Sequence, residues 1–147
     1  MGNVQGKILA ISVSDGKGVP KKNVEAARLV EDWGIEGDAH AGSGRQVSLL
    51  AAESIERIRQ LGVEVKAGDF AENITTLGID LRLLKPGDRI AAGCAVLEVT
   101  QIGKACHGGC RIYEQVGECA MPREGVFARV VSGGEIKPGD PVRAPAG

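Results

Sequence analysis

The sequence has few aromatic residues and almost no net charge. Phe, Trp and Tyr make up 3% of its 147 residues, and 18 basic residues balance 19 acidic ones to a formal charge of −1. A protein that binds nucleic acid needs basic groups for the phosphates and, for single strands, aromatic rings on which bases stack. The composition therefore argues against a nucleic-acid partner.

The sequence also lacks a targeting segment and a long apolar run. The residues from Met1 to Lys7 have no apolar signal core, and the longest apolar stretch, around Ile90 to Val99, is far shorter than the roughly 18 residues of a membrane span. We expect a cytoplasmic protein with no membrane partner. In that reducing compartment the four cysteines are expected to be thiols, ligands or catalytic groups rather than disulfides.

Glycine and proline are plentiful and divide the chain into short segments. The 22 glycines and six prolines are spread along the sequence and leave no interdomain linker. Segments 7–14, 45–51 and 94–101 are rich in β-branched residues and are predicted as strands. The tetrapeptide KPGD occurs at 85–88 and again at 137–140, and each copy predicts a tight type II turn that enters a strand. These features predict a mainly β single domain over residues 1–147, closed or nearly closed into a barrel.

One or two short helices are expected beside the strands. In segment 51–62, Ile55, Ile58 and Leu61 share one side, and Gly62 stands where a C-terminal cap belongs. In segment 23–34 the apolar residues fit neither the helical nor the strand period, and its Ala and Glu content favours a helix.

Most of the sulfur lies in one stretch, EVTQIGKACHGGCRIYEQVGEC, from Glu98 to Cys119. It holds three of the four cysteines, one of the two histidines and the only tyrosine. Positive charge lowers the pKa of a thiol and favours the reactive thiolate, and Lys104 and Arg111 stand close to Cys106. Flanking glycines let the backbone turn tightly and leave this sulfur accessible. We therefore predict a reactive thiolate at Cys106.

Other interpretations of these cysteines remain open. A free cysteine is often a small buried hydrophobe, and Cys94 is interpreted as such a core residue. Cys106, His107, Cys110 and Cys119 together match a Cys3His zinc site in number, although the spacing is loose. Cys110 or Cys119 is also a candidate for resolving a persulfide on Cys106 as a disulfide.

Several motifs together resemble the MOSC domain family, which is named after the C-terminal part of molybdenum cofactor sulfurase. They are GIEGDAHAG (34–42), RQVSLL (45–50), GDFAENITTLGIDL (68–81), LEVTQI (97–102), GKACHGGC (103–110) and MPREGVFARVVSGG (121–134). The resemblance covers about residues 7–142 and is to the short, stand-alone type. It implies a MOSC-type β-barrel whose open end has a pocket for the molybdenum cofactor, or for sulfur on its way to a metal centre.

The same resemblance implies a role for Cys106. The family's cysteine after the EVTQ-like strand is thought to carry a persulfide received from a pyridoxal-phosphate cysteine desulfurase, or to coordinate molybdenum. Many members have proline before this cysteine, where this chain has Ala105. The implied partners are such a desulfurase and proteins that assemble or accept the molybdenum cofactor.

The cofactor's phosphate calls for cations and hydrogen-bond donors around the pocket. The matching motifs and the residue types indicate a set of cofactor-binding candidates. These candidates are Arg45, His40, Glu72, Asn73, Thr75, Lys104, Arg123 and Arg129. Asp38, in the same loop as His40, is expected to end a turn.

Three functions follow as hypotheses. The first is a molybdenum cofactor-binding or sulfur-carrier protein that acts through Cys106. The second is an enzyme, a molybdenum cofactor-dependent reductase of N-hydroxylated compounds, which would need a separate electron donor. The third is a binding module with a zinc ion held by Cys and His.

Overall fold

The computed structural model describes residues 4–14, 16, 21–103 and 124–144. Eleven strands, one α-helix and one 3₁₀ helix lie in this part of the chain. The strands are β1 (Gln5–Val13), β2 (Lys22–Val24), β3 (Ala27–Val30), β4 (Gly34–Ile35), β5 (Val47–Ala51), β6 (Ile74–Leu77), β7 (Arg89–Ala92), β8 (Ala95–Ile102), β9 (Val126–Ser132), β10 (Gly134–Ile136) and β11 (Pro141–Arg143). The helices are α1 (Ala52–Arg59) and η1 (Leu81–Leu83).

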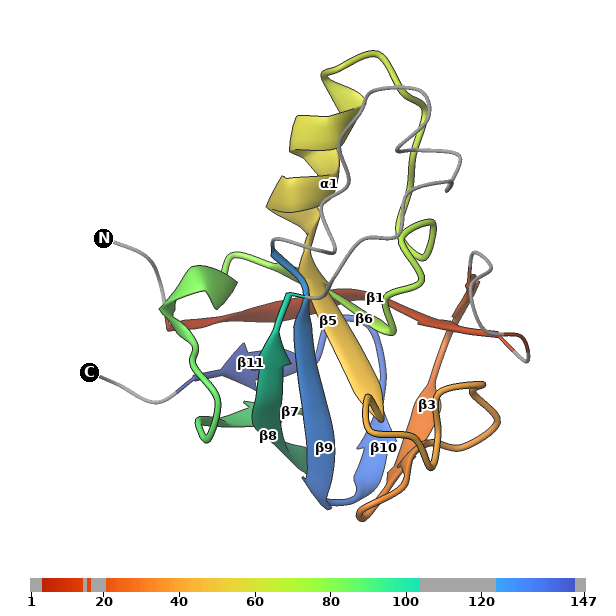
Figure 1. Ribbon diagram of the computed structural model, residues 1–147, viewed down its shortest axis with the longest axis vertical. Coiled ribbons are helices and arrows are strands. Elements are labelled where there is room, and N and C mark those ends of the chain that lie inside the picture. Colours follow the sequence, from red (N-terminus) through yellow and green to blue (C-terminus); the bar gives the residue numbers. More distant parts are fainter. Residues whose placement is uncertain (1–3, 15, 17–20, 104–123, 145–147) are drawn as a thin grey trace.

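Seven strands close into a barrel (Figure 1). The order around it is β11-β7-β8-β9-β5-β6-β1, and β1 pairs with β11 to complete the circle. Every pairing is antiparallel except that of β5 with β6. β2 extends the sheet as a partner of β1, and β10, β3 and β4 form a second, three-stranded sheet. The predicted mainly β barrel is confirmed, and its closure leaves few exposed sheet edges.

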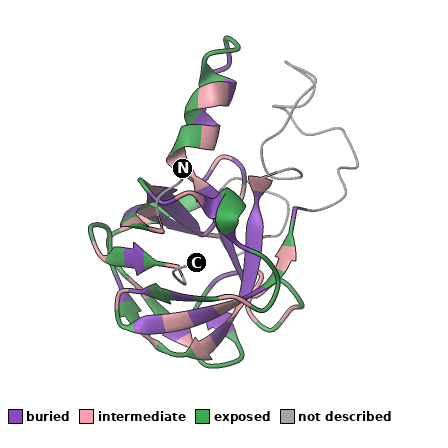
Figure 2. Ribbon diagram, turned by 90° about the vertical axis from the view of Figure 1, so that its left-hand side faces the viewer, coloured by how far each residue is buried: buried purple, intermediate pink, exposed green. Residues whose placement is uncertain are grey.

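Alternating apolar side chains fill the barrel. Along β5, Val47 and Leu49 point inward and Ser48 and Leu50 point outward, as the two-residue period of a strand requires. The inward residues of the other strands join the same buried cluster. Figure 2 shows these buried positions along the strands and exposed positions on the outer side of α1. The outward positions of the strands are therefore the ones available for building a site.

The helix predicted in segment 51–62 is confirmed as α1, which continues directly from β5 (Figure 1). Ile55 and Ile58 are buried against Leu50 and Phe127 in a second apolar cluster outside the barrel. Gly62 has the positive φ of a C-terminal glycine, +99°. The helix ends at Arg59, so Leu61 lies beyond it and is 50% exposed instead of joining the apolar side. Within the described residues, no helix combines the length and the apolar character that crossing a membrane requires.

The helix favoured for segment 23–34 is wrong. The segment contains the last two residues of β2, the whole of β3 and the first residue of β4. β3 pairs with β10 on one side and with β4 on the other, and its Leu29 is buried in the barrel core. Long-range pairing and burial thus override the helical preference of Ala and Glu.

Both KPGD turns lie where they were predicted. Each stands immediately before a strand, the first before β7 and the second before β11. Gly87 and Gly139 both have φ +96°, the left-handed backbone that the third turn position needs. In each turn the Asp carboxylate accepts a hydrogen bond from the backbone N–H of the Lys, at 3.0 Å for Lys85 and 3.0 Å for Lys137.

Candidate functional site

Polar side chains gather on the outer side of β1, β5 and β6. Ser12, Ser48 and Thr75 alternate along these strands with the core residues Ile11, Leu49 and Ile74, so they point away from the barrel interior. They are nevertheless buried, and the loop of residues 66–73 contacts two of them: Ser48 Oγ donates to the carbonyl of Ala71 at 3.3 Å, and Thr75 Oγ1 donates to Glu72 Oε2 at 2.9 Å. We call the buried polar cluster the set Ser12, Lys21, Asp38, Ser48, Glu72, Asn73 and Thr75.

The centre of the buried polar cluster is an ion pair. Lys21 Nζ lies 2.7 Å from Asp38 Oδ1, and both side chains have no exposed surface. The same ammonium lies 3.0 Å from Nδ1 of His40 and 3.5 Å from Oγ of Ser14. The His40 side chain is 25% exposed, so it connects the buried pair to the surface.

Asp38 is held as a carboxylate by its surroundings. Burial on its own would raise the pKa of Asp38, but the neighbouring side chains of His40 and Lys21 lower it. The backbone N–H groups of Ser14 and His40 donate to its two oxygens at 3.0 and 3.1 Å and lower it further. The net effect places the pKa of Asp38 far below its ordinary value. Besides ending the turn, as expected, this residue therefore carries a fixed buried charge.

Glu72 holds the loop that covers Lys21. Its Oε2 accepts the N–H of Gly68 at 2.9 Å and the hydroxyl of Thr75 at 2.9 Å, and its Oε1 accepts the N–H of Phe70 at 3.2 Å. Burial raises the pKa of Glu72, although these hydrogen bonds oppose the shift. Gly68 in turn accepts the N–H of Lys21 at 2.9 Å, so Glu72 fixes the backbone from which Lys21 projects.

Asn73 joins β5 to β1. Its side-chain oxygen accepts the N–H of Ser48 at 3.0 Å, and its amide nitrogen donates to the carbonyl of Ser12 at 3.1 Å. The Asn73 side chain is fully buried, and both its oxygen and its nitrogen form hydrogen bonds inside the protein. Glu72, Asn73 and Thr75 were all predicted from the sequence as binding residues. They lie together in the buried polar cluster, where they hold the 66–73 loop and the neighbouring strands in place.

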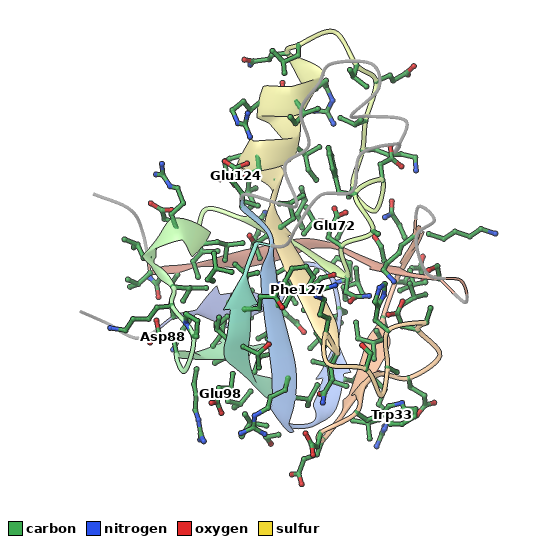
Figure 3. The ribbon with its side chains drawn as sticks, viewed as in Figure 1. Trp33, Glu72, Asp88, Glu98, Glu124 and Phe127 are labelled. Carbon is green, nitrogen blue, oxygen red and sulfur yellow. The ribbon has the colours of Figure 1, made fainter. Side chains whose placement is uncertain are left out.

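Arg45 lies on the other side of β5 from Glu72. Its guanidinium sits over the ring of Phe127, with Cζ 5.4 Å from the ring centroid, and its Nε is 3.4 Å from Oε1 of Gln101. Figure 3 shows Phe127 and Glu72 on opposite sides of β5. Within the described part of the chain, no carboxylate pairs with Arg45. Its positive charge therefore remains available to an anion at the surface.

Arg129 has a different environment. Its Nη2 lies 2.7 Å from Oε1 of Glu98, the residue that faces it across the β8–β9 pairing. Arg89 approaches the same oxygen at 4.0 Å. The structure thus brings Arg129 to the outer face of the barrel, as an ion-paired residue, and not to the buried polar cluster.

The remaining predicted residues lie outside the described residues. They are Cys106, His107, Cys110, Cys119, Lys104 and Arg123, together with Arg111. The residues at both ends of their segment are described, and they lie side by side: Gly103 donates its N–H to the carbonyl of Gly125 at 2.7 Å. Gln101 donates to the carbonyl of Gly103 at 2.7 Å. Gln101 therefore contacts both Arg45 and the residue at which the Cys106 segment begins.

Cys94 corrects one expectation. It was predicted as a core residue, but it is exposed. It follows Gly93, whose φ is +57°, in the turn between β7 and β8, so the strand begins one residue later than predicted. Among the described residues, no three His, Cys, Asp or Glu side chains gather in a way that would hold a metal ion.

An open cavity of about 400 Å³ lies between α1 and η1. Four of its charged lining residues form two ion pairs: Arg57 Nη2 lies 2.6 Å from Glu124 Oε2, and Arg82 Nε lies 2.9 Å from Asp80 Oδ1. The carboxylate of Glu53 accepts the backbone N–H of Gly78 at 3.0 Å. No predicted site residue is among its described lining. Cavity and buried polar cluster are therefore separate features, and the predicted residues favour the cluster and the adjoining Arg45 as the candidate site.

Sequence reasoning missed Lys21. In the run VPKK nothing distinguishes the buried Lys21 from the exposed Lys22 that follows it. A buried carboxylate needs a counter-charge, so Asp38 was the signal that could have prompted the search. The identity of the partner, 17 residues away, follows only from the fold.

Comparisons with known proteins agree with this architecture. A sequence model of the MOSC domain matches residues 36–143. No curated protein matches the chain by sequence. The crystal structure of the YuaD protein from Bacillus subtilis superposes with a TM-score of 0.79 and 21% identity over 95% of each chain.

Two further solved structures are of YiiM. The protein from Geobacillus stearothermophilus gives a TM-score of 0.68 at 22% identity, over 95% of this chain and 75% of that one. The protein from Escherichia coli gives 0.66 at 18% identity, over 96% of this chain and 70% of that one. At such identities the structural likeness demonstrates a shared fold.

Proposed function

The chain belongs to the MOSC domain family, and on that premise we propose that it binds the molybdenum cofactor, or carries sulfur for it, through the thiolate of Cys106. The family is associated with the molybdenum cofactor. The more specific role rests on the residues of this chain. The observation that supports it best is that Arg45, whose charge no carboxylate of the described residues compensates, contacts Gln101 beside the start of the Cys106 segment.

Chain connectivity limits the distance between Cys106 and Gly103. Gln101 accepts a hydrogen bond from Arg45 and donates one to Gly103. Three peptide units separate the Cα atoms of Gly103 and Cys106, so these atoms lie at most about 11 Å apart. A thiol within that reach of Gly103 and the guanidinium beside Gln101 are available to one ligand.

The described residues suit an anionic cofactor better than a bare metal ion. Arg45 offers a guanidinium that can take a phosphate in two parallel hydrogen bonds. The described residues contribute no metal cage, so a molybdenum centre would take its protein ligand from Cys106. When bound, the cofactor would supply a redox-active metal centre. Arg45 would hold the phosphate, and the buried polar cluster would keep His40 in place at the surface.

As a sulfur carrier, Cys106 acts as a nucleophile. Its thiolate attacks the outer sulfur of a persulfide on a pyridoxal-phosphate cysteine desulfurase, the donor's S–S bond breaks, and the donor cysteine leaves as a thiolate. The new S–S bond leaves a persulfide on Cys106. Both this reaction and metal coordination need the thiolate form. We propose that the protein acts in the cytoplasm, with a desulfurase and cofactor-assembly or acceptor proteins as partners.

Mass and metal analysis of two cysteine variants test the proposal. The protein is offered a cysteine desulfurase with cysteine, or the intact cofactor, and is then separated and measured by intact mass and by molybdenum and zinc content. We expect wild type and the exposed-thiol control Cys94→Ser to gain one sulfur atom or retain molybdenum, and Cys106→Ser to do neither. Equal gain by Cys106→Ser contradicts the proposal, and one equivalent of zinc would favour the zinc module.

A further inference from the structure

The ammonium of Lys21 has one acceptor for each of its three hydrogens. The acceptors are Asp38 Oδ1 at 2.7 Å, His40 Nδ1 at 3.0 Å and, more weakly, Ser14 Oγ at 3.5 Å. The Lys21 side chain is fully buried, so water cannot take the place of any of them. A lysine ammonium only donates hydrogen bonds. Each of these three atoms must therefore offer a lone pair toward Lys21.

For His40 this requirement selects one form of the ring. A proton on Nδ1 would point at the Lys21 ammonium from 3.0 Å, which places two donors against each other. Asp38 Oδ2 is 3.7 Å from Nδ1, too far for a hydrogen bond, and it already accepts the backbone N–H of His40 at 3.1 Å. Nδ1 thus accepts from Lys21, and the ring proton belongs on the other nitrogen, Nε2.

The other nitrogen is free to meet a ligand. Within the described residues, Nε2 of His40 has no hydrogen-bond partner, and the side chain is 25% exposed. The turn that carries it also carries Arg45: Ser43 Oγ donates to the carbonyl of His40 at 2.7 Å and accepts the N–H of Arg45 at 3.1 Å. The groups facing the imidazole are therefore the buried pair of Lys21 and Asp38, with the Arg45 backbone in the same turn.

We propose that Lys21 is a positioning residue that fixes His40 as a neutral ring with its proton on Nε2, so that His40 presents a hydrogen-bond donor to an acceptor atom of the ligand. A ligand oxygen, on a phosphate or a carbonyl, meets this requirement. A metal cation does not, because Nε2 would first have to lose its proton. The identification of that ligand with the cofactor rests on the proposed function, whereas the state of the ring is a property of the protein alone.

Nitrogen NMR of the imidazole tests the inference. The chain has two histidines, so His107→Gln leaves His40 as the only imidazole, and long-range ¹H–¹⁵N correlations then report which nitrogen is protonated across a pH titration. In the neutral form we expect Nδ1 without a proton and Nε2 with one. A protonated Nδ1 in this protein overturns the inference.

The role of Lys21 is tested by Lys21→Met in the same background. Without the ammonium, Asp38 is the remaining partner of the ring, and we expect the proton to appear on Nδ1. An unchanged Nε2–H signature overturns the role of Lys21. If the single variant does not fold, Lys21→Met combined with Asp38→Asn removes both charges, and a pure Nε2–H signature there would overturn it equally.

This experiment needs no cofactor. A wrong result for His40 leaves the sulfur transfer by Cys106 to be judged by mass and metal content. Failure of the Cys106 experiment likewise leaves the imidazole measurement intact.

Discussion

The side chains of Lys21 and Asp38 form an ion pair of 2.7 Å from which water is fully excluded. Removing two charges from water is unfavourable, and their attraction compensates only when every hydrogen-bonding group finds a partner. Here the carboxylate also receives two backbone N–H groups, and the ammonium also meets His40. Such a pair adds little net stability, but it ties the chain before β2 to the turn after β4 in one arrangement.

The first prediction concerns the energetics of this pair. Lys21→Met and Asp38→Asn each leave one charge buried without its partner, and each should lower the free energy of unfolding by about 3–5 kcal/mol. The double variant has neither charge. Its loss of unfolding free energy should be smaller than the sum of the losses of the two single variants, by at least about 1 kcal/mol. Urea unfolding of the four proteins gives the coupling energy. Strictly additive losses would contradict the ion pair.

The second prediction concerns pH. The pKa of Asp38 is lowered in the folded protein, whereas in the unfolded chain it takes the ordinary value of about 4. Between those two values the unfolded chain binds more protons, so the free energy of unfolding rises with pH. The stabilisation by the Asp38 charge is therefore complete above the ordinary value and is lost as the pH falls below it.

Asp38→Asn does not titrate at this position and serves as the reference. The difference in unfolding free energy between wild type and Asp38→Asn should be constant above the ordinary Asp range and should shrink in more acidic solution. Urea unfolding over a pH series measures it. A difference that stays constant into acid would mean that Asp38 is not a charged partner of Lys21.

The third prediction concerns the loop that Glu72 holds. Gly68 has φ +96°, and a Cβ there would lie 2.4 Å from the carbonyl oxygen of Lys21. Gly87 has the same φ of +96°, with nothing within 4 Å of such a Cβ. Gly87→Ala should therefore cost only the backbone strain, about 1–2 kcal/mol.

Gly68→Ala should cost at least about 2 kcal/mol more than Gly87→Ala, because backbone atoms around Lys21 have to shift. Urea unfolding of both variants compares the losses directly. Equal losses of unfolding free energy would show that Gly68 is not in tight contact with the backbone of Lys21.

The sequence was informative about the fold where local rules decide the structure. The KPGD turns, the strand of RQVSLL and the amphipathic α1 follow from turn chemistry and from apolar periods. Segment 23–34 was misjudged because β3 owes its conformation to β10, which lies about a hundred residues further along the chain. Composition carries no information about a partner so distant.

The sequence likewise indicated some residues of the candidate site and missed others. The motifs pointed to His40, Arg45, Glu72 and Asn73, which the structure places around β5. They did not reveal Lys21, because a lysine looks the same in a sequence whether it is buried or exposed. They also did not separate Arg45 from Arg129, because the difference depends on Glu98 facing Arg129 across a strand pairing.

The last prediction uses that difference between the two arginines. Arg45 lies over Phe127 and is bonded to the neutral Gln101, whereas the charge of Arg129 is paired with Glu98. Methionine keeps much of the apolar stem and removes the charge in both cases. A hydrogen bond to a charged group contributes about 1.5–3 kcal/mol, so Arg45→Met should weaken retention of the molybdenum cofactor by about 10-fold to 100-fold. Arg129→Met should weaken it by less than about 3-fold, because an exposed, already paired charge contributes little.

Molybdenum content after equilibration with a series of cofactor concentrations gives the two affinities, and thermal unfolding confirms that both variants are folded. The loss in Arg45→Met should also reduce the dependence of binding on salt, since salt screens the attraction between the guanidinium and an anion. Arg129→Met should keep the wild-type salt dependence. Equal losses of cofactor affinity in the two variants, or an unchanged affinity in Arg45→Met, would show that Arg45 is not part of the cofactor site.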